Sequence, residues 1–199
     1  MRPGFLLLAA ALLAAAFPFG PARAAGDAAR GRALAEEHSC GGCHGPQGVS
    51  GQPNIPSLAG QPADFITLQM ILFREVLRDA PPMPDLAQGL SDQQIEDLAA
   101  HYAALPSGPA EDRGPRDAGR FHDGALLAER LRCGICHLPD YRGRMQIPRL
   151  AGQREEYLAG AMAQYRDGRR HGSDTNMNAV MYGVTDAEIA ALAHYMAQQ

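Results

Sequence analysis

All four cysteines of this 199-residue chain lie in two copies of one pentapeptide. The first copy is CGGCH, at residues 40–44, and the second is CGICH, at residues 133–137. Each copy brings two thiols and one imidazole together within a few residues, and no cysteine remains for another use. This feature constrains the fold more than any other, because each half of the chain must surround whatever these groups hold.

The C-x-x-C-H pattern is typical of covalent haem attachment. The two thiols add to the vinyl groups of the porphyrin, and the histidine that follows gives the iron its proximal nitrogen. Two copies therefore predict two covalently bound haem c groups with their iron. The residues that would attach them are Cys40, Cys43, His44, Cys133, Cys136 and His137.

Three other uses of paired cysteines compete with haem. A zinc site of four thiolates leaves the histidines unexplained, and the 89 residues between Cys43 and Cys133 exceed the spacing of a zinc ribbon. A thioredoxin-like dithiol predicts one pair in a βαβ setting, which is not visible in this sequence. Two disulfides suit an exported protein but also leave the histidines without a role.

Bacterial haem attachment takes place outside the cytoplasm, so the haem interpretation requires an export signal. Arg2 precedes an apolar run over residues 5–17, and Ala22-Arg23-Ala24 fits a cleavage site. We predict a signal peptide over residues 1–24, cleavage after Ala24 and a periplasmic mature protein. The apolar run is short for a membrane span, and an uncleaved N-terminal anchor is the alternative.

The charge of the chain argues against nucleic acid as a partner. The formal net charge is −4 at pH 7, and every one of the 18 basic residues is arginine. Residues 25–106 carry 4 arginines and 10 acidic residues, whereas residues 120–199 carry 10 arginines and 9 acidic residues. The two regions are expected to present different faces to protein partners.

The similarity between the two regions extends beyond the pentapeptides. The segment IPSLAGQ at residues 55–61 recurs as IPRLAGQ at residues 147–153, and the LSD at residues 90–92 recurs as VTD at residues 184–186. The offset stays between 92 and 94 residues, which indicates a tandem duplication of one domain.

The segment between the copies is rich in proline, glycine and charge, and it predicts an exposed linker. We therefore expect an N-terminal domain over residues 25–106, a linker over residues 107–119 and a C-terminal domain over residues 120–199. Each domain is small for an independent core, so the haem is expected to supply an apolar plate on which the chain packs.

The local signals in both domains are helical. Ser91 with Gln94 and Thr185 with Glu188 are capping boxes, each followed by an apolar stripe. Further apolar stripes occupy residues 65–73 and 157–165, and short helices are expected near residues 27–38 and 119–132. Strand-like alternation does not rise above noise, so the fold is expected to be all-α, with long loops around the cofactor.

Electron carriers usually fill the second axial position of the iron, and the duplication suggests which side chain does so. Met83 and Met177 each lie 8 residues before a capping residue, and no other methionine pair keeps this register. Pro82 and Pro84 flank Met83, and Met177 lies between two asparagines, which predicts a loop at both methionines. A thioether ligand raises the reduction potential of the haem.

Several other side chains remain as alternatives for the second axial ligand. Met181 lies close enough to Met177 to replace it. Met70 and Met162 lie on helical stripes and are interpreted as packing residues. The other histidines are interpreted as surface or core residues, with His171 the least secure: they are His38, His101, His122, His171 and His194.

A proximal histidine usually donates its second ring N–H to a carbonyl group, which fixes its orientation. The repeated Ile-Pro segment is well placed to provide that carbonyl. Pro56 and Pro148 are the candidates, and two turn prolines without this role are the alternative.

With these motifs, the chain resembles the cytochrome c4 family of two-domain, dihaem class I c-type cytochromes. The resemblance covers the whole mature chain and rests on the haem motifs, the Ile-Pro-x-Leu-Ala-Gly-Gln repeat, the Leu-Ser-Asp helix and residues 157–170. It implies two tandem class I cytochrome c-like domains and axial methionines at Met83 and Met177. Two departures lie in the first domain: the family pattern has a glycine near Val76, and its Arg-x-Asn-x-x-Met approach is altered over residues 78–83.

The resemblance implies an electron carrier rather than an enzyme. The expected partners are redox proteins: a terminal oxidase, a quinol–cytochrome c reductase or a periplasmic dehydrogenase. Peripheral association with the membrane is a further expectation, and no small-molecule substrate is expected. The alternatives are the electron-accepting haem subunit of a dehydrogenase, such as flavocytochrome sulfide dehydrogenase, and a haem enzyme with an open axial site.

Overall fold

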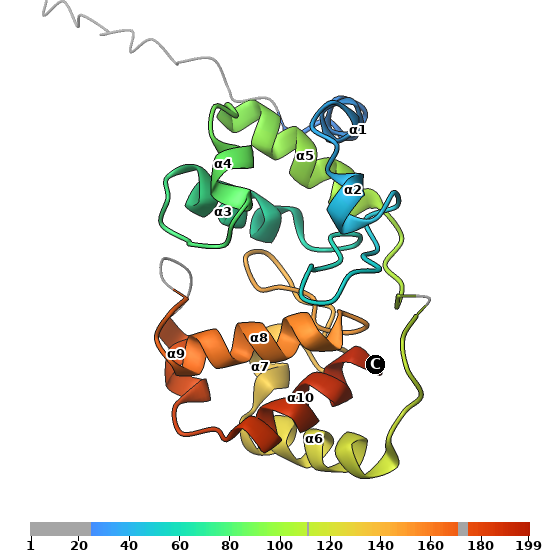
Figure 1. The fold of residues 1–199 in the computed structure, drawn as a ribbon, viewed down its shortest axis with the longest axis vertical. Coiled ribbons are helices and arrows are strands. Elements are labelled where there is room, and N and C mark those ends of the chain that lie inside the picture. Colours follow the sequence, from blue (N-terminus) through green and yellow to red (C-terminus); the bar gives the residue numbers. More distant parts are fainter. Residues whose placement is uncertain (1–24, 111, 171–174) are drawn as a thin grey trace, which may run out of the picture.

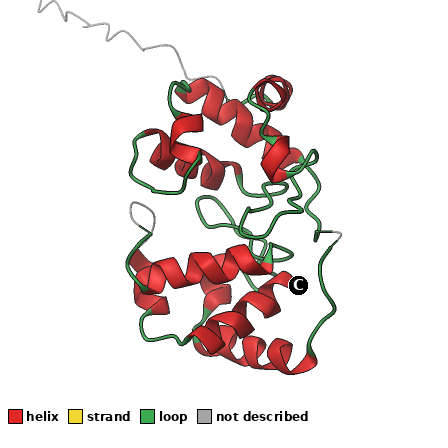
Figure 2. Cartoon of the chain, in the orientation of Figure 1, coloured by secondary structure: helices red, strands yellow, loops and turns green. Residues whose placement is uncertain are grey.

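A computed structural model describes residues 25–110, 112–170 and 175–199. The predicted signal peptide at residues 1–24 and the candidate His171 lie outside the described residues. Within the described ranges the chain forms α-helices and no β-strand (Figure 2). The prediction of an all-α fold is therefore confirmed. None of the described helices is both long and apolar enough to cross a membrane.

The helices form two sets that follow the same order along the chain. The first set is α1 (Ala28–Glu37), α2 (Gly41–His44), α3 (Ala63–Arg74), α4 (Met83–Ala87) and α5 (Asp92–Ala104). The second set is α6 (Ala118–Arg130), α7 (Cys133–His137), α8 (Glu155–Arg166), α9 (Thr175–Met181) and α10 (Asp186–Ala197). The sets occupy the upper and lower halves of Figure 1. The helices predicted near residues 27–38 and 119–132 are α1 and α6.

Both predicted capping boxes are present. The backbone N–H of Gln94 donates to Ser91 Oγ at 3.3 Å, and the backbone N–H of Ser91 donates to the side-chain Oε1 of Gln94 at 2.9 Å. Thr185 and Glu188 repeat the arrangement at 3.3 and 2.9 Å. Caps of this kind contribute about 1 kcal/mol each, and here they fix where α5 and α10 begin.

A glycine in each half allows the first and last helices of that half to lie against each other. A Cβ atom on Gly31 of α1 would lie 1.9 Å from the Asp97 carbonyl oxygen of α5. A Cβ atom on Gly124 of α6 would lie 2.2 Å from the Ala191 carbonyl oxygen of α10. No side chain fits at either contact, and the resulting close packing positions the pentapeptide that follows α1 or α6.

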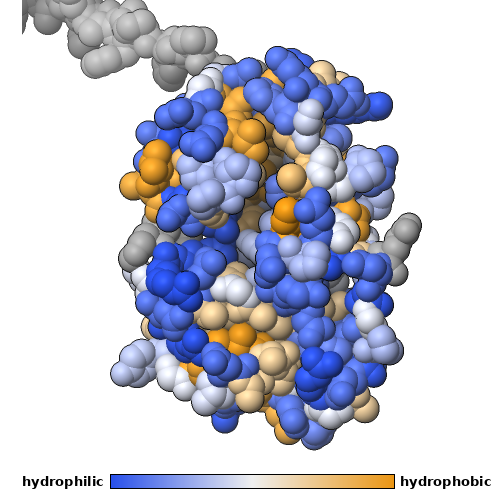
Figure 3. All heavy atoms as spheres, viewed as in Figure 1, coloured by the Kyte–Doolittle hydropathy of each residue, from blue (hydrophilic) through white to orange (hydrophobic). Residues whose placement is uncertain are grey.

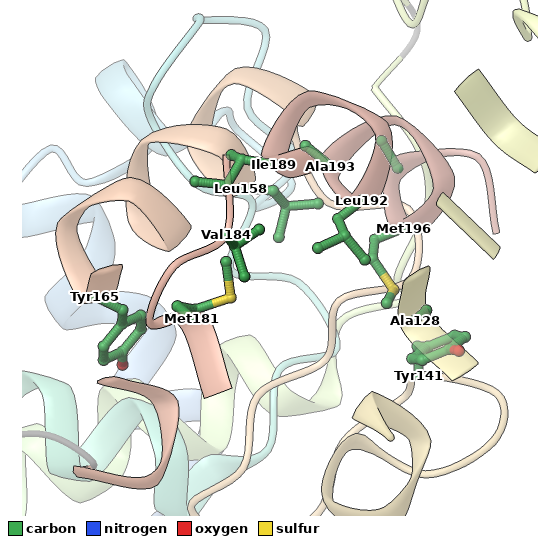
Figure 4. Close-up of a cluster of buried hydrophobic side chains, with 11 residues drawn as sticks. Ala128, Tyr141, Leu158, Tyr165, Met181, Val184, Ile189, Leu192, Ala193 and Met196 are labelled. Carbon is green, nitrogen blue, oxygen red and sulfur yellow. The ribbon is translucent and has the colours of Figure 1, made fainter. Parts of the chain in front are cut away.

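Each half has its own apolar core. The first contains Ala35, Ile66, Leu90, Ile95, Leu98, Ala99 and Tyr102. The second, drawn in Figure 4, contains Ala128, Tyr141, Leu158, Tyr165, Met181, Val184, Ile189, Leu192, Ala193, Met196 and Ala197. Both cores are built mainly from the apolar stripes that the sequence predicts.

The two halves meet through loops rather than helices. The main helix–helix contacts all fall within one half: α1 with α5 and α3 with α5 in the first, and α6 and α8 with α10 in the second. Loops from both halves fill the space between them in Figure 1. The connecting segment packs on the second half, where Arg113 donates to the Ala197 carbonyl oxygen at 3.0 Å and Gln198 donates to the Gly114 carbonyl oxygen at 3.1 Å.

Candidate haem sites

Each pentapeptide forms a single helical turn that begins directly after a left-handed residue. Ser39, with φ 54°, precedes Cys40, the N-cap of α2. Arg132, with φ 59°, precedes Cys133, the first residue of α7. These sharp turns end the preceding helix and place both thiols and the histidine of each motif on one short segment.

All four thiols are free, so the disulfide alternative is wrong for this fold. The first cysteine of each pair is partly buried and the second is exposed. Burial raises the pKa of the Cys40 and Cys133 thiols. The four-thiolate zinc alternative also fails, because the described residues contain no group of three or more His, Cys, Asp and Glu side chains that could hold a metal ion.

The two proximal histidines have the same hydrogen bond. His44 Nδ1 lies 2.8 Å from the Pro56 carbonyl oxygen, and His137 Nδ1 lies 2.9 Å from the Pro148 carbonyl oxygen. A carbonyl oxygen can only accept, so Nδ1 carries the proton and Nε2 keeps its lone pair for a metal. Both imidazoles are buried, and burial lowers the pKa of His44, which favours the neutral, ligating form. The prediction for Pro56 and Pro148 is confirmed.

The two candidate methionines occupy equivalent places at half-buried positions. Met83 is the first residue of α4, and Met177 lies within α9, so the expectation of loops at these positions was wrong. Pro84 is compatible with α4 because the amide that proline lacks has no partner in the first turn of a helix.

The competing methionines lie in or against the apolar cores. Met181 is 2% exposed and lies among Val184, Leu192 and the other core side chains of Figure 4. Its equivalent in the first half is Ala87, which is also buried. Met70 and Met162 pack against the cores of their own halves, as predicted.

Buried arginines near the loops between the halves were not singled out by the sequence. Arg149, Arg154 and Arg170 are at most 7% exposed, and the Nε atom of each has no hydrogen-bond partner among the described residues. An unpaired buried guanidinium N–H is costly, and carboxylates are its natural partners. The one signal in the sequence was the exclusive use of arginine, which is better suited than lysine to such pairing.

Taken together, the residues present fit haem c. Each half offers two free thiols, a histidine whose Nδ1 is bound to a prolyl carbonyl and a methionine in the equivalent place, and the unpaired Nε atoms of the three buried arginines suit the propionates of the porphyrin. On the face drawn in Figure 3, apolar residues gather toward the middle of each half and polar residues surround them. An apolar, carboxylate-bearing plate matches this combination.

A tyrosine lies beside the first cysteine of each pair, and the sequence did not reveal either one. The Tyr102 hydroxyl is hydrogen-bonded with the Cys40 thiol, and burial raises the pKa of the Tyr102 phenol. Tyr141 lies near Cys133 and is hydrogen-bonded with Tyr195. The two tyrosines come from different elements, because Tyr102 belongs to α5 and Tyr141 to the loop after α7.

Comparison with known proteins assigns both halves to cytochrome families. Residues 26–101 match the family described as cytochrome C oxidase, cbb3-type, subunit III, and residues 121–199 match the cytochrome c family. Cytochrome c4 of Azotobacter vinelandii is 34% identical over 193 residues, covering 89% of this chain and 91% of that protein. The thiosulfate dehydrogenase electron acceptor of Thiomonas intermedia is 32% identical, covering 97% of this chain and 90% of that protein.

The solved structures agree with the sequence comparison. Reduced cytochrome c4 from Pseudomonas stutzeri superposes with a TM-score of 0.79 at 30% identity, covering 87% of this chain and 98% of that structure. The similarity therefore spans both halves and the arrangement of one half against the other.

Proposed function

Because this chain belongs to the cytochrome c4 family, and is therefore a dihaem electron carrier with redox proteins as partners, we propose that it carries electrons in the periplasm between respiratory partners, with a terminal oxidase as the acceptor. The observation that carries this proposal is the matched pair of buried histidines, each with Nδ1 bound to a prolyl carbonyl, which makes Nε2 the nitrogen that would ligate iron. Electron transfer requires a site whose coordination stays the same in both oxidation states, and each half offers the histidine for one such site.

In this proposal each haem is held by residues of one half. The first is attached at Cys40 and Cys43 and ligated by His44 and Met83. The second is attached at Cys133 and Cys136 and ligated by His137 and Met177. When bound, haem c would supply one-electron transfer at its iron, and ligation by the histidine and the methionine of each half would exclude oxygen and peroxide.

The chain contributes orientation and exclusion of water. The prolyl carbonyls orient the imidazoles, the apolar cores lower the local dielectric, and thioether ligation raises the reduction potential. These influences set the potential at which each half accepts and releases an electron, and little rearrangement accompanies the transfer.

The domain limits and the location follow from the same proposal. Residues 25–106 and 120–199 are the two domains, residues 107–119 link them, and residues 1–24 are removed on export to the periplasm. The packing of each helix set within its own half supports this division. N-terminal sequencing of the protein from the periplasmic fraction tests it: a start other than Ala25, or recovery in the membrane with residues 1–24 intact, would contradict the export step.

A second candidate is the role of electron acceptor for a periplasmic dehydrogenase. The relative from Thiomonas intermedia that carries this description is similar over nearly the whole of this chain. Stopped-flow mixing of the oxidised protein with a thiosulfate dehydrogenase and thiosulfate, and of the reduced protein with membranes that contain a terminal oxidase, separates the two candidates. Fast reduction with slow oxidation by the membranes would favour the dehydrogenase.

An optical redox titration of the mature protein tests the proposed ligands. The ferric protein is expected to show the weak far-red band of methionine ligation from both haems. Met177→Leu should remove it from one haem and lower the potential of that haem. Met181→Leu is the matched control, because it changes a methionine of the same helix that lies in the core: it should keep both bands and cost stability only. Loss of the band in the Met181 variant instead would reverse the assignment.

A further inference from the structure

Two glutamines of the repeated Ile-Pro-x-Leu-Ala-Gly-Gln segment join the halves in a reciprocal way. Gln61 of the first half accepts from the Arg149 amide N–H at 2.9 Å and donates to the Arg149 carbonyl oxygen at 2.9 Å. Gln153 of the second half accepts from the Ser57 amide N–H at 2.8 Å and donates to the Ser57 carbonyl oxygen at 2.9 Å. Both glutamines are 3% exposed, so water does not compete for these bonds.

The residues bound by the glutamines directly follow the prolines that hold the proximal histidines. The Pro56 carbonyl and the Ser57 amide N–H belong to one planar peptide group. That group therefore accepts from His44 Nδ1 at one end and donates to Gln153 Oε1 at the other. In the second half, the peptide group between Pro148 and Arg149 accepts from His137 and donates to Gln61.

Hydrogen bonds that are linked through one peptide group in this way strengthen one another. An acceptor on the peptide N–H increases the negative charge on the carbonyl oxygen of the same group. In condensed phases this polarisation strengthens each hydrogen bond by roughly 10–30%. The carbonyl then binds the histidine N–H more strongly, and the imidazole becomes a more basic ligand. Burial enhances this polarisation, since the local dielectric is low.

We propose that Gln61 and Gln153 are positioning residues that act across the boundary between the halves, each setting the strength of the histidine hydrogen bond in the opposite half. The proposal rests on the proposed function, since it takes His44 and His137 as the proximal ligands. Gln153 supports His44 of the first half, and Gln61 supports His137 of the second. Each site is complete only when the other half is in place.

The two series of hydrogen bonds differ in one detail, which predicts that the two glutamines affect their haems to different extents. Gln153 Oε1 also accepts from the Arg154 amide N–H at 2.9 Å, so its negative charge is shared between two donors. Gln61 Oε1 has the Arg149 amide as its hydrogen-bond donor. Removal of Gln61 should therefore affect the second haem more than removal of Gln153 affects the first.

A purely mechanical role for the glutamines makes a different prediction. If they only hold the halves together, their loss loosens the contact and admits water to both haems, which stabilises the ferric state and lowers both potentials. Loss of the hydrogen-bond chain weakens the histidine as a donor to iron, which disfavours the ferric state and raises the potential of one haem. The sign and the identity of the affected haem separate the two roles.

The test uses the mature holoprotein and its Gln61→Leu and Gln153→Leu variants, which serve as controls for each other. The reduction potentials are measured optically and assigned to each half by proton NMR. Gln153→Leu should raise the potential of the first haem, and Gln61→Leu that of the second, each equivalent to roughly a twofold to threefold change in the reduction equilibrium. In the reduced protein, the Nδ1 proton of the opposite half's histidine should move upfield and exchange faster with solvent.

A third variant, Gln153→Glu, keeps the oxygen acceptor and tests the proposal if a leucine variant fails to fold. It should return the first haem to the wild-type potential or below it. A shift confined to the haem of the mutated half, a fall in both potentials or an unchanged histidine proton would overturn the proposal. Failure of the proposed function is distinguishable, because the wild-type protein itself would then not titrate as two haems.

Discussion

The two halves hold the start of their first helix with different chemistry. In the first half, the amide of the α1 N-cap Asp27 donates to the buried carboxylate of Asp97 at 2.8 Å. In the second half, the amide of the α6 N-cap Asp117 donates to Nε2 of the buried His194 at 2.9 Å, while His194 Nδ1 lies 2.8 Å from Glu155. The duplication kept the backbone contact and exchanged the acceptor, because any buried acceptor at this point satisfies the N-cap amide.

The tyrosines beside the cysteines show the same principle in packing. In the first half, Gly48 leaves room for the Tyr102 ring, which comes within 3.1 Å of where a Cβ on Gly48 would lie. In the second half, Tyr141 stands in the place of Gly48, and Met196 in the place of Tyr102. The tyrosine ring comes from α5 in the first half and from the loop after α7 in the second, so the volume beside the cysteine is filled in both halves.

The halves differ in backbone strain at the second residue after helices α3 and α8. Gly168, with φ 65°, terminates this segment in the second half, and Val76, with φ 55°, occupies the equivalent place in the first. A β-branched residue is poorly suited to the left-handed region. Val76 is also 68% exposed, so its side chain gains little from packing. A glycine here, as the resemblance to the family implies, would avoid this strain.

The largest expected effect tests whether the contact of α1 with α5 and the contact of α6 with α10 are equivalent. Gly31→Ala and Gly124→Ala should each destabilise their half by about 3 kcal/mol or more, because the new methyl group meets a backbone carbonyl in both. Denaturant unfolding followed by helical circular dichroism and haem absorption measures this. Gly119→Ala is the control: its Cβ would have Asp117 Oδ1 as its nearest neighbour at 3.4 Å, so little change is expected. A loss in only one half would show that the crossings are not equivalent.

The next effect concerns the Asp97 anchor of the first half. Hydrogen bonding from Arg30, followed by that from the Asp27 amide, lowers the pKa of Asp97 to about 2. Asp97→Asn keeps an acceptor for the Asp27 amide but loses the charge, and it should cost about 1–2 kcal/mol after allowance for the solvent screening of Arg30, which is 54% exposed. Urea unfolding at neutral pH measures the difference, and an unchanged stability would show that the charge of Asp97 has no net value.

The same anchor predicts a pH dependence. The folded-state pKa of Asp97 lies below its ordinary value of 3.8, so its contribution is full above that value and disappears as the pH falls toward 2. The stability difference between wild type and Asp97→Asn should therefore shrink over this range and disappear below pH 2. A difference that is undiminished at pH 2 would contradict the assignment.

The smallest expected effect has the opposite sign. Val76→Gly should stabilise the first half by about 1 kcal/mol, because relief of the left-handed strain exceeds the added flexibility of the unfolded chain. Thermal unfolding of the holoprotein measures it. The reverse change, Gly168→Val, should destabilise the second half by a similar amount or more. If Val76→Gly is destabilising, the valine makes a contact that outweighs its strain.

Much of the fold was predictable because its signals are local. The capping boxes at Ser91 and Thr185 and the helices before each pentapeptide depend on residues within one or two turns of each other. The Pro56 and Pro148 hydrogen bonds were also predictable, since the proline lies only 12 or 11 residues after its histidine. The placement of Met83 and Met177 in helices was missed, because flanking prolines and asparagines suggest loops unless the start of a short helix is considered.

By itself, the sequence determined that the chain has two copies of one haem-binding domain, because attachment chemistry, helix periodicity and caps are written in neighbouring residues. Only the tertiary structure decided how the copies meet. The residues of the pairs Gln61–Arg149 and Ser57–Gln153 lie 88 and 96 residues apart in the sequence. The three arginines become buried only when the two halves pack against each other. A contact between distant segments leaves no periodicity in one sequence, since its energy depends on geometry that only folding creates.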